Sequence, residues 1–326
     1  MISDSDIDGA VAILRSGGLV AFPTETVYGL GADASSADGV GRIYAAKGRP
    51  ADHPVIVHVA DAVQVANWAS DIPEAAHRLA RRLWPGPLTL VLRRARGVGD
   101  FVTGGQDTVA VRVPSHPVAQ QLLRRFGGGI AAPSANRFGR VSATTAAHVR
   151  EEFGPAVGCV LDGGAADVGI ESTIVDLSGG KPRLLRPGAI TAQAIEDAAG
   201  EPLGAVDLHA PRAPGTLAAH YAPGTPLVLA EGDLVRELAA SLARQGKKVA
   251  ALAFSQARPL DPGLVWIAAA RDAAQYAHDL YANLRRLDAA GCDMLIVERP
   301  PQAPEWAAVN DRLARAAAGA SPADDV

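Results

Sequence analysis

Cysteine, aromatic residues and long apolar runs are all scarce in this chain of 326 residues. The two cysteines, Cys159 and Cys292, lie far apart and outside any ligand motif, so we expect two buried free thiols rather than a disulfide framework or a zinc site. Only 5 % of the residues are aromatic, so the core is expected to consist of Ala, Val, Leu and Ile. No apolar run reaches the about 20 residues that span a bilayer, and we expect no membrane segment. The acidic, polar start (MISDSDIDGA) is unlike a signal peptide, which favours the cytoplasm.

An excess of positive charge is missing as well. The net charge of −4 argues against a dedicated nucleic-acid-binding protein, which usually carries a basic footprint. Arginines cluster locally at Arg78, Arg81 and Arg82 and at Arg124 and Arg125. These clusters are interpreted as solvated helix faces, although a weak contact with RNA stays open.

Short apolar segments alternate with amphipathic segments over the first two thirds of the chain. Ile7, Val11 and Leu14 share one helical face, and Ser36 is placed to cap a second helix. Strands are expected at 19–22, 55–59, 88–92, 109–113, 130–132, 158–161, 173–176 and 183–185. Residues 1–200 are therefore predicted to form an α/β domain, with helices on a twisted sheet of mixed strand order.

A segment rich in Pro and Gly interrupts this pattern. Residues 201–225, with APRAPGTLAAHYAPGTP at their centre, have the composition of a linker. Strands and helices then alternate again through residues 226–326, which predicts a smaller, doubly wound α/β domain.

Standard nucleotide-binding and hydrolase signatures are absent from the sequence. There is neither a G-x-x-x-x-G-K-[ST] loop nor a convincing G-x-G-x-x-G at a helix start. The glycines of 29–31 and 127–129 are interpreted as tight turns. A serine elbow and a His-Glu-x-x-His motif are missing too.

Polar clusters at the ends of predicted strands and helices take the place of those signatures. They are Thr24-Glu-Thr26, Lys47-Gly-Arg49, Ser134-Ala-Asn136, Glu171-Ser172-Thr173 and Arg186. Taken singly, each is explained by turns or helix ends, and His58 by core packing. Arg112 is the exception, because a charge inside V-A-V-R-V needs an anionic partner or a wet cleft. Since open α/β sheets bind ligands at strand ends, the set together favours binding of a polyanion and a carboxylate over covalent catalysis.

These motifs resemble those of the YrdC-type threonylcarbamoyl-AMP synthases, in the form that has two domains. Lys47-Gly-Arg49 with Ser134-Ala-Asn136 is similar to the family pattern K-x-R…S-x-N. The other similar motifs are FPTETVYGLG (22–31), HPVIVHV (53–59), WPGPLTLVL (84–92), VAVRVP (109–114), ESTIVD (171–176), LLRPGAIT (184–191) and HYAP (220–223). The resemblance is strong over residues 5–195 and weaker beyond them.

The resemblance implies a YrdC-like twisted mixed sheet around a large concave cavity, followed by a Rossmann-like α/β domain. It also implies a nucleotidyltransferase that makes threonylcarbamoyl-AMP and pyrophosphate from L-threonine, bicarbonate and ATP. Mg²⁺ would come with ATP, and no dedicated protein metal site is predicted. A tRNA threonylcarbamoyl transferase complex would then receive the product.

Roles for individual residues follow from the same resemblance. The L-threonine site would consist of Thr26, His58, Arg112, the backbone at Ala132, and Ser172. The ATP site would consist of Arg49, His53, Thr108, Ser134, Ser142, Arg186 and Tyr221. The catalytic signature would be Lys47, Arg49, Ser134 and Asn136, with Lys47 and Asn136 neutralising charge near the reacting phosphate. Tyr221, in the linker, would close over the site as a lid. His53 departs from the Asn that many relatives carry, and the linker PGTLAAHYAP is less basic than in relatives.

Three alternatives are weighed against this interpretation. An RNA-binding module without catalysis fits poorly with the acidic net charge. A carbamoyl transferase of the hydrogenase-maturation kind needs cysteine-rich fingers, which two cysteines cannot supply. An inactive relative is disfavoured because the Lys47, Arg49, Ser134 and Asn136 signature is intact.

Overall fold

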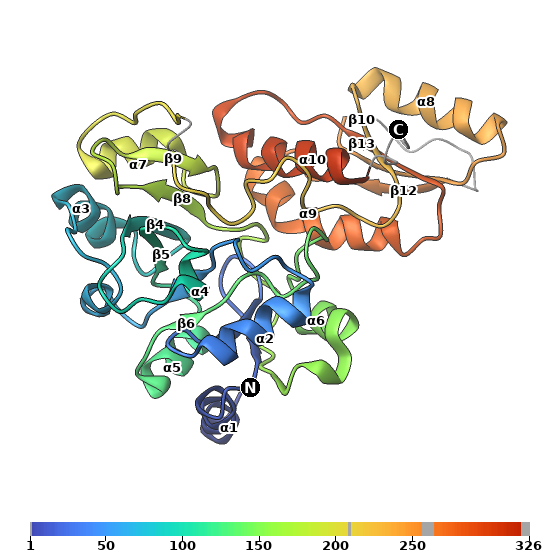
Figure 1. The fold of residues 1–326 in the computed structure, drawn as a ribbon. Coiled ribbons are helices and arrows are strands. Elements are labelled where there is room, and N and C mark those ends of the chain that lie inside the picture. The colour runs from blue at the N-terminus through green and yellow to red at the C-terminus, as the bar shows by residue number, and fades with distance from the viewer. Residues whose placement is uncertain (1, 208–209, 256–263, 321–326) are drawn as a thin grey trace. The chain divides into compact units, whose positions relative to one another are not determined.

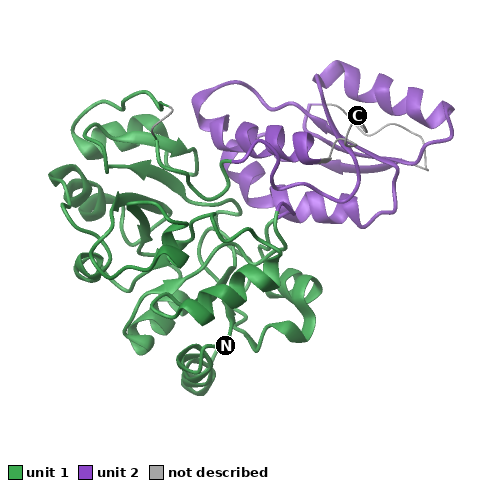
Figure 2. Cartoon of the chain, viewed as in Figure 1, with its two compact units in different colours: residues 1–138, 142–216 green, residues 139–141, 217–326 purple. Residues whose placement is uncertain are grey.

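The computed structural model describes residues 2–207, 210–255 and 264–320 (Figure 1). It contains two compact units, which Figure 2 distinguishes by colour. The first consists of residues 1–138 and 142–216, and the second of residues 139–141 and 217–326. The division between 216 and 217 lies within the Pro- and Gly-rich segment. Residues 139–141 belong to the second unit, where the Ala222 amide donates to the Gly139 carbonyl at 2.8 Å.

The first unit is built on a nine-stranded sheet of order β7-β1-β2-β6-β3-β5-β4-β8-β9, which contains parallel and antiparallel pairs. Its strands are β1 (Val20–Phe22), β2 (Gly29–Asp33), β3 (Ile56–His58), β4 (Leu88–Arg93), β5 (Thr108–Arg112), β6 (Ile130–Ala131), β7 (Cys159–Val160), β8 (Thr173–Asp176) and β9 (Arg183–Arg186). Its helices are α1 (Asp4–Arg15), α2 (Ala37–Lys47), α3 (Glu74–Leu83), α4 (Asp100–Thr103), α5 (Pro117–Phe126), α6 (Ala146–Phe153) and α7 (Ala192–Ala199), with the short 3-10 turns η1 (Val63–Asn67) and η2 (Gly154–Ala156). The predicted mixed α/β fold is confirmed.

Local sequence signals fix the ends of the first helices. Ser3 and Asp6 form a capping box at the start of α1, which buries Ile7, Val11 and Leu14 along one face as the periodicity predicts. Ser36 caps α2 by accepting from the Gly39 amide, and Gly48 ends it in the left-handed conformation. This cap brings the polar residues at 47–49 to the end of a helix.

Alternation along the central strands gives the sheet two different faces. On β3, β5 and β4 the mutually paired residues Val57, Val111 and Leu90 all belong to the main hydrophobic core. Successive strand residues point to opposite faces, so their neighbours His58 and Arg112 lie on the other face. The same strands thus bury an apolar core on one side and carry polar groups on the other.

Strand β2 corrects the interpretation of the glycines at 29–31 as a tight turn. Gly29 and Gly31 lie inside β2, antiparallel to β1. A Cβ atom on Gly31 would lie 2.8 Å from side-chain atoms of both Phe22 and Ile130. These glycines therefore permit close packing rather than a reversal of the chain, and a pattern based on β-propensity cannot detect such a strand. The helices α6 and α7 also lie where the sequence pattern predicts none.

The second unit contains a four-stranded, wholly parallel sheet of order β10-β13-β11-β12. Its strands are β10 (Leu227–Ala230), β11 (Val249–Ala253), β12 (Val265–Ala268) and β13 (Met294–Glu298), and its helices are α8 (Gly232–Arg244), α9 (Ala273–Asp288), α10 (Ala307–Ala320) and the turn η3 (Pro304–Trp306). Helix α8 covers one face, and α9 and α10 pack together on the other (Figure 1). This arrangement confirms the predicted smaller α/β domain.

The exposure of the two cysteines corrects one further sequence expectation. Cys159 and Cys292 are free, but both are partly exposed rather than buried. Cys159 lies on the two-residue edge strand β7, and Cys292 lies in the turn before β13, so neither position is enclosed by the core. Among the described residues, none of the helices has the length and apolar character required to cross a bilayer.

The packing of Gly31 leads to a stability prediction. Gly31→Ala should lower the free energy of unfolding by about 1–3 kcal/mol, because Phe22 and Ile130 must shift to admit the methyl group. Gly41→Ala is the matched control, because Gly41 lies in α2 with open space around its Cα. This change should instead raise stability by about 0.5–1 kcal/mol. Chemical denaturation measures both, and an equal effect of the two substitutions would contradict the packing role of Gly31.

Candidate active site

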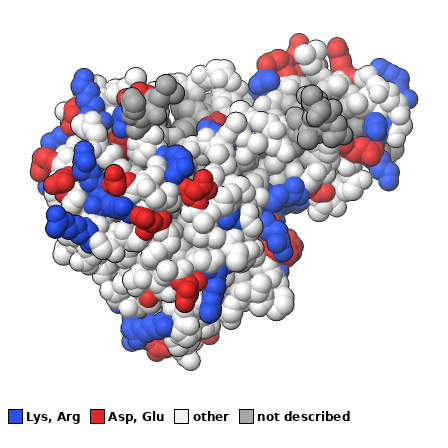
Figure 3. Space-filling view, viewed as in Figure 1, with Lys and Arg blue, Asp and Glu red and all other residues white. Residues whose placement is uncertain are grey.

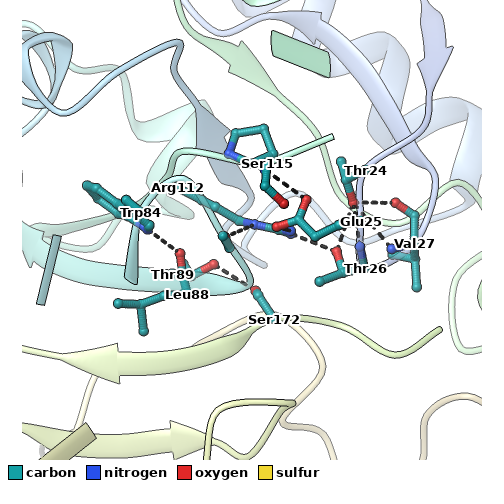
Figure 4. Close-up of polar contacts among 12 residues, drawn as sticks. Thr24, Glu25, Thr26, Val27, Trp84, Leu88, Thr89, Arg112, Ser115 and Ser172 are labelled. Carbon is teal, nitrogen blue, oxygen red and sulfur yellow. Dashed lines mark hydrogen bonds and ion pairs between the residues drawn. The ribbon is translucent and has the colours of Figure 1, made fainter. Parts of the chain in front are cut away.

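Neighbouring strands bring polar residues from distant parts of the chain into one row. Arg112, the last residue of β5, pairs with His58 on β3 and with Thr89 on β4. Ser172, just before β8, places its Oγ 2.7 Å from Thr89 Oγ1 (Figure 4). Beside this row, the same face carries a small apolar cluster that includes Val91 and Ala110. This face of the sheet therefore carries a row of polar side chains beside a small apolar cluster.

The Arg112 guanidinium is buried and held on three sides (Figure 4). Its Nε donates to the Gly86 carbonyl at 3.3 Å, and Nη1 donates to Thr26 Oγ1 at 2.8 Å. Nη2 lies 2.7 Å from Oε1 of Glu25, which is also buried. Of the two surroundings predicted for Arg112, an anionic partner or a wet cleft, this pair supplies the first. Burial has the largest single effect and raises the pKa of Glu25, but the charge of Arg112 and the hydrogen bonds to the carboxylate together leave that pKa below its usual value.

Arg186 and Ser172 continue the row beyond β4. Arg186 Nε and Nη2 donate to the Ser172 carbonyl at 3.0 and 2.9 Å, and Nη2 also donates to Ser172 Oγ at 3.1 Å. Its Nη1 donates to the Pro214 carbonyl at 2.8 Å. Next to Ser172 in sequence, Glu171 accepts from Ser142 Oγ at 2.5 Å. All of these side chains are buried, so their geometry is fixed by the fold.

A second buried cationic group surrounds Lys47 at the end of α2. Lys47 Nζ donates to the Ser134 carbonyl at 2.6 Å and to the Asn136 carbonyl. Asn136 Nδ2 in turn donates to the Arg137 carbonyl at 2.7 Å. Burial, and secondarily the charge of Arg49, hold the pKa of Lys47 well below its usual value. The K-x-R and S-x-N segments, 87 residues apart, therefore form one structural unit.

Arg49 and His53 flank the ring of Phe138. Arg49 Nη2 donates to the Pro54 carbonyl at 2.8 Å, and its guanidinium lies 5.6 Å from the centre of the Phe138 ring. The His53 ring meets that of Phe138 edge-on at 5.4 Å. Burial and the neighbouring Arg49 charge lower the pKa of His53. A neutral imidazole beside a guanidinium can donate one N–H hydrogen bond to a bound anion.

Backbone contacts and charge join the two groups. The Ala132 amide, just after β6, donates to the Ile56 carbonyl of β3 at 2.9 Å, and Ser134 forms an isolated bridge with Gly29. The carboxylate of Glu171, adjacent to Ser172, acts on Lys47 by raising its pKa against the larger lowering effects. The Lys47 group and the segment that carries Ser172 therefore lie within electrostatic reach of each other.

His58 is buried beside this row and packs edge-on against Phe22, with ring centres 6.0 Å apart. Burial, and secondarily the charge of Arg112, lower its pKa to about 3. Its Nδ1 has no hydrogen-bond partner within the described part of the chain. A buried polar atom of this kind is available to a ligand.

Two predicted site residues remain. Thr108 begins β5, about 13 Å from Arg112 at the usual rise per residue, and the parallel register of β3 and β5 leads from it towards Pro54, whose carbonyl accepts from Arg49. Tyr221 belongs to the second unit, where it is buried, stacks on Tyr281 and lies beneath the guanidinium of Arg312 at 5.2 Å. Its role as a lid stays a prediction.

Several residues that shape the site are not singled out by the sequence. Glu25 and Glu171 stand out there only as members of polar clusters, and Thr89 and Phe138 do not stand out at all. Thr89 is detectable in hindsight, because it is the polar residue of an apolar strand. Phe138 has no comparable signal, because its partners are defined only by the fold. Among the described residues, no group of three His, Cys, Asp or Glu side chains is arranged to hold a metal ion.

Buried cations and a row of hydroxyls on a mixed sheet are typical of a two-domain α/β enzyme that binds anionic substrates. Two family models cover most of the chain. The model of the Sua5, YciO and YrdC proteins, described as "Telomere recombination", matches residues 12–188, and the threonylcarbamoyl-AMP synthase C-terminal domain matches residues 190–318. The chain belongs to the threonylcarbamoyl-AMP synthase family.

Individual relatives agree over nearly the whole chain. The threonylcarbamoyl-AMP synthase of Pyrococcus abyssi is 42 % identical, over 94 % of this chain and 92 % of the relative. That of Bacillus subtilis is 40 % identical, over 97 % of this chain and 94 % of the relative. The crystal structure of P. abyssi Sua5 complexed with L-threonine superposes with a TM-score of 0.91 at 41 % identity, covering 98 % of this chain and 96 % of that one.

The low pKa of His58 predicts how stability depends on pH. Unfolding restores the pKa of His58 to about 6.5. Below pH 6.5, His58 therefore binds a proton in the unfolded chain but stays unprotonated in the folded chain. Stability should therefore fall as the pH drops from 6.5 towards 3, and His58 should account for about 2 kcal/mol by pH 5. Denaturation of wild type and His58→Gln at about pH 7 and pH 5 measures this contribution. Parallel losses in the two proteins would show that His58 does not contribute.

Proposed function

We propose that this chain joins L-threonine, bicarbonate and ATP into threonylcarbamoyl-AMP with release of pyrophosphate, the first step of threonylcarbamoyladenosine formation in tRNA. The observation that carries the proposal is that two buried cationic side chains, Arg112 and Lys47, are each held by buried hydrogen bonds, and that Glu171, next to Ser172, acts on the charge of Lys47. The carbamate of threonine and the α-phosphate of ATP are both anionic. A site that brings them together must therefore supply fixed positive charge and hydrogen-bond donors.

The Arg112 row is proposed as the threonine site. A guanidinium already fixed by its neighbours is suited to a planar carboxylate, and Thr26, Ser172 and the open Nδ1 of His58 offer partners for the amine and hydroxyl. The backbone at Ala132 completes this set. Because the His58 imidazole stays neutral, it can accept a hydrogen bond without adding charge.

The Lys47 group is proposed as the nucleotide site. Arg49, His53, Ser134 and Ser142 line the part contributed by α2 and the loop after β6, and Arg186 adds a second buried guanidinium from β9. Lys47 and Asn136 are proposed to neutralise the charge that develops as pyrophosphate leaves. Thr108 and the lid role of Tyr221 remain part of this proposal on resemblance alone.

The phosphates of ATP need a counter-ion, and the labile product needs an acceptor. Mg²⁺ is proposed to arrive bound to ATP, where it screens the leaving pyrophosphate. The product is proposed to pass to a tRNA threonylcarbamoyl transferase complex, which places the enzyme in the cytoplasm beside its tRNA. Direct RNA binding is not required. On the face seen in Figure 3, basic side chains are interspersed with acidic ones.

Arg112→Lys provides the sharpest test of the threonine site. Lysine keeps the positive charge but lacks the planar guanidinium with its fixed N–H donors, so kcat/KM for threonine should fall about hundredfold. Pyrophosphate release in the presence of ATP, Mg²⁺ and bicarbonate measures the effect, with threonine or bicarbonate omitted as blanks.

Arg183→Lys is the matched control, because Arg183 also pairs with a buried carboxylate, that of Asp176, in the same sheet. It should lower stability and leave kcat/KM for threonine unchanged. If pyrophosphate release did not depend on threonine, the enzyme would use another acceptor for the adenylyl group. Failure of the folded wild type to release pyrophosphate at all would refute the proposed function.

The metal proposal makes a separate prediction. If Mg²⁺ enters only with ATP, calorimetric titration of Mg²⁺ into the ATP-free protein should give no binding isotherm, while chelation of Mg²⁺ should abolish pyrophosphate release. The Mg²⁺ concentration needed for half-maximal release should then follow the ATP concentration. A tight isotherm without ATP would instead reveal a protein-borne metal site.

A further inference from the structure

Glu25 has no part in the roles assigned so far, yet three segments of the first unit meet at its carboxylate and backbone (Figure 4). It lies in the loop between β1 and β2 and is 5 % exposed. Its Oε1 lies 2.7 Å from Arg112 Nη2, and its Oε2 accepts from the Ser115 amide at 3.1 Å. Its own carbonyl accepts from the Val168 amide at 2.7 Å. The segments before α5, before β8 and at the end of β5 are thus all tied to this residue.

The pair formed with Arg112 sets the charge balance at the proposed threonine site. A guanidinium that is 3 % exposed is costly to bury without a counter-ion, and Glu25 is the carboxylate that faces it. Gly86 contacts Nε of the guanidinium, Thr26 contacts Nη1, and Glu25 contacts Nη2. Arg112 is therefore already oriented and already neutralised before a ligand arrives.

Both atoms of the ion pair keep hydrogen-bonding capacity. The contact between Arg112 Nη2 and Glu25 Oε1 has the distance of an ion pair, but it is not aligned as a hydrogen bond. Neither atom has another hydrogen-bond partner among the described residues. A donor and an acceptor thus lie side by side in a buried setting, next to the hydroxyl of Thr26.

The neutrality of this pair affects which ligand the site prefers. A ligand that carries only a carboxylate would leave one negative charge in excess beside the neutral pair, where the local dielectric constant is low. A zwitterionic amino acid brings a carboxylate and an ammonium group together and adds no net charge. The charge of Glu25 therefore favours the amino acid over an acid of the same shape that lacks the amine.

We propose that Glu25 is a positioning and specificity-determining residue, which holds Arg112 in place and makes the site select a zwitterionic amino acid over its carboxylate-only analogue. This inference rests on the proposed function of the Arg112 row as the threonine site. It requires no direct contact between Glu25 and the substrate.

The test compares two ligands on two variants of the full-length protein. The ligands are L-threonine and its hydroxy analogue, in which a hydroxyl replaces the ammonium group, and calorimetry without ATP gives both Kd values. Glu25→Gln removes the charge and keeps an acceptor for the Ser115 amide. It should weaken threonine binding at least about tenfold and affect the hydroxy analogue less, so the preference for threonine should shrink. In turnover, KM for threonine should rise more than kcat falls.

Two variants separate this role from a general loss of structure. Asp176→Asn is the matched control, because Asp176 is a buried carboxylate paired with Arg183 at 2.6 Å and lies outside the proposed site. It should leave both Kd values unchanged. Glu25→Asp keeps the charge with a shorter reach, and should restore most of the preference for threonine. If Glu25→Gln does not fold, the ratio of the two Kd values for Glu25→Asp tests the inference. Loss of the preference for threonine in this variant, which retains the charge, overturns the inference.

Different outcomes contradict the role of Glu25 and the proposed function. Equal weakening of both ligands by Glu25→Gln, or no weakening of either, overturns the role of Glu25 in selection while the wild type still binds threonine. A wild type that binds no threonine and releases no pyrophosphate refutes the proposed function instead.

Discussion

The burial of one positive charge, on Arg112, constrains much of the first unit. A guanidinium at the end of an interior strand is tolerated only where the surrounding chain supplies a counter-ion and acceptors. The loop after β1 supplies Glu25 and Thr26, and the turn before β4 supplies the carbonyl of Gly86. Loops that would otherwise be variable connections are therefore held in defined positions by a single charged side chain.

The order of the strands explains how distant motifs come to share one site. Strand β5 lies between β3 and β4, so Arg112 has His58 on one side and Thr89 on the other. Strand β6 lies between β2 and β3, so the loop after it reaches the end of α2, where Lys47 binds the carbonyl of Ser134. A mixed sheet permits this order because antiparallel and parallel neighbours enter from opposite ends. A simple meander of the same strands would separate the two signature segments.

The second unit is organised by a different principle. Its parallel sheet is covered on both faces, and its interior strand β11 is buried along its whole length. Tyr221 adopts a left-handed backbone conformation with φ of 61° and is held there by Tyr281 and Arg312 within the same unit. Such a conformation is strained for a tyrosine and persists only where packing fixes it. The linker motif is therefore a structured part of the second unit rather than a flexible connection.

By itself, the sequence determined the local structure and the chemistry of the site. Hydrophobic periodicity and capping residues predicted most helices and strands, because these features depend on neighbours along the chain. The position of Arg112 within an apolar strand indicated an anionic partner or a wet cleft. Tertiary structure alone decided that Gly31 lies in a strand, that Glu25 is the partner of Arg112, and that Phe138 lies beside Arg49. Each of these depends on contacts between segments that are far apart in sequence, and such contacts are set by strand order and register, which no local pattern encodes.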